Sequence, residues 1–549
     1  MKRKKLALKA AAVMLGTVLA VSGCAQTEET AGNEQAESVT LPITEDVTLN
    51  IWARNTHNVV DNMKDMGCYQ VITDNTNIKL NFISPVANQQ QEQFNIMIAS
   101  GEYPDIIEQL PDYYPGGFVK AHQDGVILEL SDLIDKYAPN LNALFETYPQ
   151  VRDESMDENG NLFAVPMIRG GNIVRTYTGP IVRADYLEKF GLDIPTTIDD
   201  WHNMLTVFKN NGITYPLTAT RNYFYSQAVF QGAFGVNAVF YMDNGKIHYG
   251  PYEEGWKEYV KTMAQWYKEG LLDSEIMSND QSIADSKIKT QGAGAFVGTC
   301  GNSIGGYMQD MQSTNPEFDL VAVPYPVLNE GETNRFVQRD SIAQPRNGSS
   351  ITTTCEHPEI AMAFLDYGFS KEGHLALNFG VEGESYEMVD GSPKYTEIVT
   401  NNPEGFSVSK AGSLYARAFT FGTMVQDVKY GEQFYGMPRQ LEAGTVWTQG
   451  LEEIQNNNPR VLGDITLEQS DETTSMQNEI NTYTSEMFVR WIMGREDIDE
   501  TWDAYKQQLQ QMGIETILQY KQEAYDRYLQ KYPDMKQPGE FEVSDYYWN

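Results

Sequence analysis

One cysteine stands where the chain could be covalently modified. Cys24 follows two small residues, after a segment with four basic residues at 2–5 and an apolar, uncharged stretch over 10–21. That stretch fits the core of a secretory signal, about 7–15 residues, and is too short to cross a bilayer, which takes about 20. We therefore expect 1–23 to be a signal peptide and Cys24 to become a lipid-bearing amino terminus. The alternative is an ordinary signal peptide with a chance cysteine.

Other residues that could do chemistry are scattered. No H-E-x-x-H, Walker A or Rossmann glycine pattern occurs, and the six histidines stand singly. Cys68, Cys300 and Cys355 lack C-x-x-C spacing, which favours buried free thiols over metal or redox sites. We expect no cofactor and no metal. A glycoside hydrolase, which needs only two suitably placed carboxylates, stays open as an alternative because the chain has 76 acidic residues.

Polar and aromatic side chains follow several expected strands and crossings, where they could contact a small solute. Aromatic rings offer flat apolar faces, and amides and guanidinium groups offer hydrogen bonds. The plain alternatives are that the aromatic residues pack in the core and that the arginines pair with carboxylates. The candidates are Arg54, Asn55, Glu108, Gln109, Tyr113, Arg175, Tyr177, Tyr223, Tyr225, Phe296, Thr299, Asn302 and Trp447.

The elements that would position these residues follow an α/β rhythm. Strand patterns at 47–52, 79–83 and 104–107 alternate with helix patterns at 59–76 and 89–100, which is typical of a parallel sheet. In such sheets ligands lie at the carboxyl ends of the strands.

Helical patterns dominate the rest of the chain. Gly191 should end a helix over 185–190, and Thr197 or Asp199 should cap the next. The four large apolar residues spaced along one face of 252–269 should face the core. A strand is expected at 294–297. The carboxyl third should be mostly helical over 473–528, with breaks near Gly494 and Gly513. The Tyr223–Tyr225 run falls in an expected loop opening a helix, and Trp447 in a polar, glycine-flanked stretch.

The charge is strongly acidic. The formal net charge is −36, with 40 basic and 76 acidic residues. The segment 1–23 carries five basic residues and no acidic one, so the mature chain has 35 basic against 76 acidic residues, or −41. This excludes nucleic-acid binding, which needs a basic face, and makes a neutral ligand the preferred one. The segment 24–45 is polar and acidic, as expected of a disordered tether.

Several blocks along the mature chain resemble the extracellular solute-binding proteins, family 1, of bacterial ABC importers. The blocks occur in family order at 99–107, 130–140, 182–201, 361–367, 378–383, 502–505 and 524–528. The resemblance implies a type II periplasmic-binding-protein fold, with two lobes of mainly parallel sheet joined by crossing hinge strands. The lobes would comprise 46–172 with 343–400, and 173–342 with 401–549.

The same resemblance implies a monomeric, non-enzymatic lipoprotein outside the bacterial cell membrane. It would close its lobes on an oligosaccharide and deliver it to ABC transporter permease subunits. A neutral oligosaccharide is preferred, and an acidic glycan stays open because some relatives bind uronate-containing glycans. A peptide or another small solute is the alternative ligand.

The chain departs from relatives that carry a calcium loop. The corresponding segment 209–216 has no carboxylate, so we expect no calcium there. The segment 157–161 looks superficially like a calcium loop. It lacks a glutamate at the twelfth loop position, which is Ile168, and its Asn-Gly pair favours a hairpin turn.

Overall fold

The computed structural model describes residues 39–548 except 57–59, 87–88, 158, 227–228, 291, 335, 421, 450–464 and 532–541. The expected signal peptide, Cys24 and most of the expected tether lie outside the described residues. Within that described part, no helix is long and apolar enough to cross a membrane.

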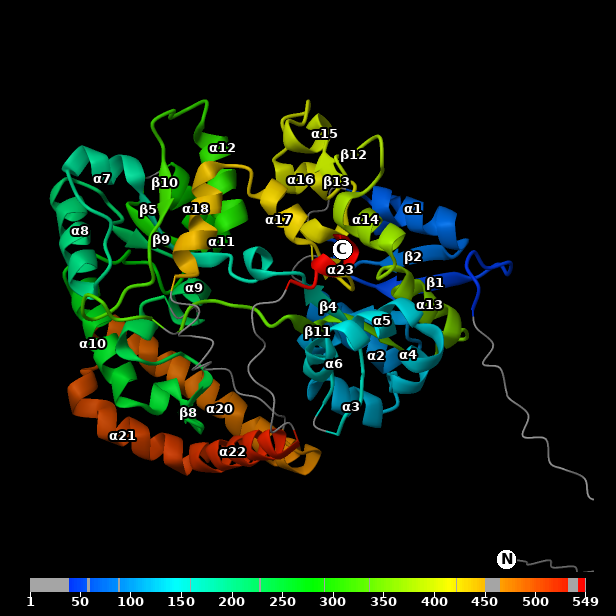
Figure 1. Ribbon diagram of the computed structural model, residues 1–549. Helices are drawn as coiled ribbons and strands as arrows, with labels where there is room; N and C mark the ends of the chain where they lie inside the picture. The colour runs from blue at the N-terminus through cyan, green and yellow to red at the C-terminus, as the bar shows by residue number, and fades with distance from the viewer. Residues whose placement is uncertain are drawn as a thin grey trace, which may run out of the picture. The chain divides into compact units, whose positions relative to one another are not determined.

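A six-stranded mixed sheet organises the first lobe, in the order β14-β4-β11-β3-β1-β2. Strands β1, β2, β4 and β11 of this sheet are labelled in Figure 1. The chain forms the expected parallel neighbours β1, β2 and β3, whereas β11 runs antiparallel to both β3 and β4. The strands are β1 (Thr48–Trp52), β2 (Lys79–Ile83), β3 (Ile106–Glu108), β4 (Val165–Arg169), β11 (Ala343–Ile351) and β14 (Val425–Gln426).

Short helices and one hairpin surround this sheet. For example, α1 packs on α14 beside β2. The helices are α1 (Gly67–Thr76), α2 (Gln90–Ser100), α3 (Gly117–Gln123), α4 (Ser131–Tyr137), α5 (Pro139–Thr147), α6 (Pro149–Ser155), α13 (Pro358–Tyr367), α14 (Lys371–Phe379), α15 (Glu397–Thr400), α16 (Val408–Gly412), α17 (Val428–Phe434) and α23 (Asp545–Trp548); the hairpin joins β12 (Tyr386–Val389) to β13 (Ser392–Tyr395).

A four-stranded sheet, in the order β10-β5-β9-β6, organises the second lobe. Only β6 and β9 pair in parallel; β5 is antiparallel to both of its neighbours. The strands are β5 (Thr178–Arg183), β6 (Leu217–Thr218), β9 (Ala295–Thr299) and β10 (Leu320–Ala322), with a hairpin of β7 (Phe240–Asp243) and β8 (Lys246–Tyr249). The α/β class is thus confirmed, but the sheets are mixed rather than mainly parallel, because strands that follow a crossing enter in the opposite direction.

The helices of the second lobe confirm several sequence patterns. A capping box between Thr197 and Asp200 begins α8, and Gly494 and Gly513 separate the last three long helices with positive φ angles. The helices are α7 (Ala184–Phe190), α8 (Ile198–Asn210), α9 (Arg221–Ser226), α10 (Glu254–Lys268), α11 (Gln281–Lys289), α12 (Tyr307–Met311), α18 (Pro438–Trp447), α20 (Leu467–Ile492), α21 (Ile498–Gln511) and α22 (Ile514–Lys531).

Each sheet has its own hydrophobic core, and the chain crosses between the cores several times. The segments 170–177 and 323–342 cross side by side, and a third crossing joins α17 to α18. Ile173, in the first crossing, and Phe434, the last residue of α17, pack against both cores. All three cysteines of the described body are free and buried, as expected.

The observed cores correct two segment boundaries. Residues 416–430 had been assigned to the second lobe, but Phe419, Val425 and Tyr430 pack in the first core, as do Val543 and Tyr547 near the carboxyl end. The tether was expected to reach 45. Instead Ile43 is buried, and its backbone N–H donates to Thr76, so the folded body begins earlier than the charge pattern indicated.

Two local expectations are also wrong. The helix expected over 59–76 begins only at Gly67, because the N–H groups of Gly67 and Cys68 donate to Leu414 and Tyr415 instead of joining a longer helix. The Asn-Gly turn at 157–161 does not join two strands of a hairpin; it connects α6 to the segment before β4.

Candidate ligand-binding cavity

A cavity of about 960 Å³ is lined by residues of both lobes and of a crossing segment. This volume lies at the upper end of the range for small-molecule sites, about 300–1,000 Å³. The first lobe supplies α3, the 154–164 region and the start of β11; Tyr177 and 339–341 come from the crossings; and the second lobe adds Ile465, Ser470 in α20 and Lys521 in α22.

A tight turn at 157–161 forms part of the first-lobe wall. The Asp157 carboxylate accepts hydrogen bonds from the backbone N–H groups of Asn159 (2.8 Å) and Asn161 (2.9 Å), and from the Asn161 side-chain amide (2.9 Å). The Asp157 side chain therefore stabilises the turn by accepting hydrogen bonds from residues within it, as aspartate and asparagine commonly do in turns. Asp157 is therefore satisfied within the turn, and the turn presents side-chain amides at the cavity.

The two neighbouring crossings are joined by a polar network under Tyr177. Arg169, at the end of β4, forms an ion pair with Asp340 (2.9 Å), and its guanidinium carbon lies 5.3 Å from the centre of the Tyr177 ring. The Gln338 side-chain oxygen accepts from the backbone N–H groups of Tyr177 (2.8 Å) and Thr178 (3.2 Å). Burial, with the nearby Asp340 carboxylate, raises the pKa of Tyr177, so its phenol stays neutral.

A second polar chain leads from the cavity toward β1. Asn347 lines the cavity and accepts a 3.4 Å hydrogen bond from Gln109, whose side-chain oxygen accepts from Arg54 at 2.7 Å. Gln109 has a φ of +56°, a left-handed conformation that is uncommon for a residue with a side chain. Arg346, another lining residue, pairs with Asp112 at 2.7 Å.

The charges of the lining are balanced although the whole chain is strongly acidic. Among the described lining residues, the carboxylates are Glu154, Asp157 and Asp340, and the permanent cations are Arg339, Arg346 and Lys521. The three carboxylates all accept hydrogen bonds from the protein, Glu154 from the backbone N–H of Ala343 at 2.9 Å. The remaining lining is rich in amides, hydroxyls and rings: Gln123, Asn159, Asn161, Gln344, Asn347, Ser155, Ser341, Ser470, Phe118, His122, Phe163 and Tyr177.

Comparison with known proteins identifies the family. Residues 69–374 match the family model of the bacterial extracellular solute-binding proteins. The chain belongs to this family.

Relatives and solved structures agree with this placement. The chain is 24% identical to the fructooligosaccharide ABC transporter substrate-binding protein FusA of Streptococcus pneumoniae, over 94% of this chain and 97% of that protein. It is 27% identical to the lipoprotein LipO of Bacillus subtilis, over 57% of this chain and 62% of LipO. The structure of the alginate-binding protein AlgQ2 without calcium ion superposes with a TM-score of 0.73 and 26% identity, over 89% of this chain and 100% of that one.

In this solute-binding protein, Tyr177 is the one residue among the thirteen candidates that lines the cavity. Arg54 and Gln109 border it through the polar chain to Asn347. Arg175 is buried, and its Nε donates to the backbone oxygen of Asp340 at 2.9 Å, so it stabilises the crossing.

Other candidates have structural roles in this conformation. Glu108 is buried in an ion pair with Arg417, and Asn55 donates to the Val60 backbone oxygen at 2.8 Å. Tyr113 packs among aromatic rings of the first lobe, 5.2 Å from Phe94 between ring centres.

The second-lobe candidates are also placed away from the cavity lining. Tyr223 and Tyr225 lie in the short helix α9 rather than in a loop, and they pack partly buried against the core. Phe296 and Trp447 are core residues with 1% exposure each. Thr299 caps the helical segment Cys300–Gly306 by accepting from the Ser303 N–H, and Asn302 is exposed.

One motif escaped the sequence analysis. Gly301-Asn-Ser-Ile-Gly305 matches the spacing G-x-S-x-G and follows strand β9, the context of a hydrolase nucleophile. Ser303 is only 5% exposed, however, and its hydroxyl accepts the Thr299 N–H at 3.0 Å. A nucleophile also needs a base beside it, and the contacts described for Ser303 include no histidine. The segment therefore has the spacing of the motif without its chemistry.

Most of the lining was not predicted. The sequence analysis considered 157–161 only as a possible calcium loop and not as part of a ligand site. The segment 339–347 carries no sequence motif. Its side chains meet the cavity because a crossing and an irregular strand bring them there, with a register shift between Gln344 and Ser349.

Proposed function

We propose that this protein captures a neutral oligosaccharide in the cavity between its lobes and presents it, unchanged, to an ABC importer. The supporting observation is a cavity whose described lining residues combine amides, hydroxyls and aromatic rings with equal numbers of acidic and basic side chains. Sugar hydroxyls match amides, sugar faces match rings, and a balanced lining does not favour a charged ligand. The names of FusA and AlgQ2, a fructooligosaccharide and an alginate binder, support a glycan as the ligand class.

The binding step we propose is closure about the crossings. An oligosaccharide that touches Tyr177, the 157–161 turn and the helices α20 and α22 contacts both lobes at once. Such a ligand stabilises the conformation in which those contacts coexist, and so shifts the population toward it. The closed rims would then be recognised by the permease subunits. Lipid on Cys24 would hold the monomeric protein at the outer face of the cell membrane.

The first experiment identifies the ligand. The mature protein without lipid is screened by thermal shift against kestose, nystose, maltotriose, cellotriose, trigalacturonate and a tripeptide. We expect neutral oligosaccharides to raise the melting temperature while chromatography finds them intact. A shift with trigalacturonate alone contradicts the neutral ligand, a shift with the peptide alone contradicts the glycan, and released monosaccharide contradicts the transport role.

The second experiment tests the site. Tyr177→Ala should weaken calorimetric affinity for the sugar found in the screen about tenfold, the value of one good ring contact. Tyr177→Phe, which keeps the ring, should stay close to wild type. Asn302→Ala, an exposed second-lobe change outside the cavity lining, is the matched control. Unchanged affinity in Tyr177→Ala, with an unchanged melting temperature, would remove this cavity as the site.

A further inference from the structure

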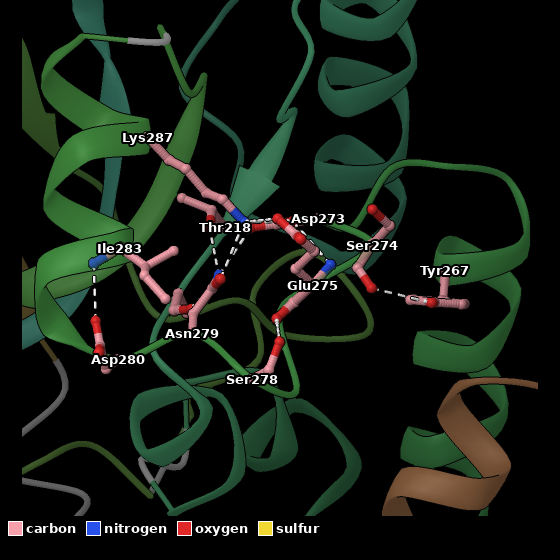
Figure 2. Close-up of polar contacts among 11 residues, drawn as sticks. Thr218, Tyr267, Asp273, Ser274, Glu275, Ser278, Asn279, Asp280, Ile283 and Lys287 are labelled. Carbon is pink, nitrogen blue, oxygen red and sulfur yellow. Dashed lines mark hydrogen bonds and ion pairs between the residues drawn. The ribbon is translucent and has the colours of Figure 1, made fainter.

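A lysine ammonium is enclosed by oxygen atoms inside the second lobe (Figure 2). Lys287, on α11, is 3% exposed. Its Nζ lies 3.0 and 2.8 Å from the two carboxylate oxygens of Asp273, 2.9 Å from Glu275 Oε2 and 2.9 Å from Asn279 Oδ1. The ring centre of Tyr215 lies 4.8 Å away. The ammonium is therefore surrounded in the way a bound cation would be.

The oxygen ligands of this ammonium are themselves fixed. Asp273 is 1% exposed and accepts further hydrogen bonds from Thr218 Oγ1 (2.7 Å), Asn279 Nδ2 (2.7 Å) and the Glu275 N–H (2.9 Å). Burial alone would raise the pKa of Asp273, but the hydrogen bonds from Lys287 and Asn279 leave it below its ordinary value. Burial alone would lower the pKa of Lys287, but the bonds to Asp273 and Glu275 leave it above its ordinary value. Both groups are thus charged in the folded state at neutral pH.

The cluster holds the segment that follows strand β6. Thr218 is the last residue of β6, and Asn279 Nδ2 also donates to the backbone oxygen of Ala219 at 3.1 Å. The Asn279 backbone oxygen accepts the N–H of Arg221, the first residue of α9, at 3.2 Å. Displacement of Asp273 or Asn279 would therefore release the start of α9.

Helix α9 connects this cluster to the cavity. Arg221, the first residue of α9, donates a 2.6 Å hydrogen bond to Ser485 of α20, the helix that also supplies Ser470 to the cavity lining. The position of α9 is therefore coupled through this contact to a helix that lines the cavity.

We propose that Lys287 is a built-in cation, which positions the start of α9 in place of a dissolved metal ion. Calcium holds loops with several oxygen ligands at about 2.3–2.6 Å; here the oxygens stand 2.8–3.0 Å from a covalently attached ammonium. With this arrangement the segment 217–226 needs no dissolved cation to hold it in place. An effect of Lys287 on ligand binding depends on the proposed function, whereas its positioning of the segment 217–226 does not.

The test uses the mature protein without lipid and needs no sugar. Lys287→Ala leaves the carboxylates of Asp273 and Glu275 beside an ammonium-sized hole. We expect its melting temperature to fall by roughly 5–15 °C because a buried carboxylate loses its partner. We expect hydrogen–deuterium exchange at 217–226 to become about tenfold faster or more, while exchange in the first lobe stays unchanged.

Calcium rescue supplies a readout that ordinary packing loss would not give. Millimolar calcium chloride should restore much of the melting temperature and the slow exchange at 217–226 in Lys287→Ala, and should leave wild type unchanged. Lys289→Ala is the matched control, since Lys289 lies on the same helix and pairs with Asp310 at 3.0 Å near the surface. It should show neither the exchange change nor the calcium response.

A second variant covers the case in which Lys287→Ala does not fold. Lys287→Gln/Asp273→Asn removes the buried charges but keeps hydrogen-bonding groups, so it should fold and give no calcium response. Exchange at 217–226 should still be faster than in wild type, because an amide pair holds the segment less firmly than a charged cluster. Wild-type exchange at 217–226 in that variant, or in a folded Lys287→Ala protein without calcium, would overturn the proposal. So would a folded Lys287→Ala protein whose stability does not respond to calcium.

Discussion

Replacement of Trp447 by alanine separates a core role from a ligand role for a residue that the sequence offered as a ligand contact. Trp447 is 1% exposed at the end of α18, and its ring lies against Gly179 in β5. Its indole N–H reaches the Pro180 backbone oxygen at 3.4 Å, a long hydrogen bond that contributes little. The cost should therefore come from lost apolar contacts and the cavity left behind, about 3–5 kcal/mol of unfolding free energy.

The contact with Gly179 provides a check on the loss of unfolding free energy expected for Trp447→Ala. A methyl group on Gly179 would stand 2.4 Å from the Trp447 ring, so Gly179→Ala alone should cost about 1–3 kcal/mol through overpacking. In the double variant the methyl enters the space that the indole leaves. The two costs should then combine to at least about 1 kcal/mol less than their sum, as expected for residues in direct contact.

The assay is urea unfolding of the mature protein followed by far-ultraviolet circular dichroism, with calorimetric titration of the sugar identified in the screen. At temperatures where the variant is folded, its affinity should be within about twofold of wild type, since Trp447 does not line the cavity. Additive costs in the double variant would refute the packing argument. A stable Trp447→Ala protein with lost affinity would return Trp447 to the binding site.

Three further predictions follow from buried polar contacts. Arg417→Met should cost about 3–5 kcal/mol of unfolding free energy because it leaves the Glu108 carboxylate buried without a partner, and adding Glu108→Gln should restore part of it. Deleting 542–549 removes a ring stacked 3.6 Å from His374, and should lower the stability of the first lobe by about 3 kcal/mol or more in the same urea assay. The pKa of Asp273 is lowered on folding, so its stabilisation is present above the ordinary carboxyl pKa and is lost as pH falls through the folded-state value. Asp273→Asn should therefore show a shallower fall of melting temperature between pH 5 and pH 3 than wild type, the interval around the ordinary carboxyl pKa of about 3.9.

Local patterns in the sequence predicted local structure well. Gly101 and Gly191 end helices α2 and α7 in the left-handed conformation, and the apolar face of α10 is buried as its spacing indicated. These features depend on residues within one or two turns of each other, so they can be read from the sequence. The α/β class followed from the same signals because alternating strands and helices leave few other layer arrangements.

Long-range contacts explain what the sequence did not predict. Glu108 is the last residue of β3, at the carboxyl end where ligands are commonly bound, but its ion-pair partner Arg417 is 309 residues away in the sequence. The two side chains are buried together. Similarly, the strand signal at β14 is two residues long, and no local pattern could place it beside β4 in the first sheet. The boundary at 401 failed for this reason: the chain stays with the first core beyond 401, through Phe419, Val425 and Tyr430, and no local pattern marks that continuation.

The two lobes contribute unequal numbers of described residues to the cavity lining. Most lining residues belong to the first lobe, whereas Tyr177 lies on a crossing and the second lobe supplies Ser470 and Lys521 from its carboxyl-terminal helices. A ligand can thus make most of its contacts with the first lobe before the second lobe contributes. Among the described residues, the second-lobe contacts of Ser470 and Lys521 lie on long helices, so a small rotation about the crossings would change both together. The Arg169–Asp340 pair lies at those crossings and touches Tyr177, so the ligand-facing ring and the hinge share one polar network. From the proposed function we therefore expect selectivity to depend mainly on the first lobe, and the free energy of closure to depend on the crossings and on α20 and α22.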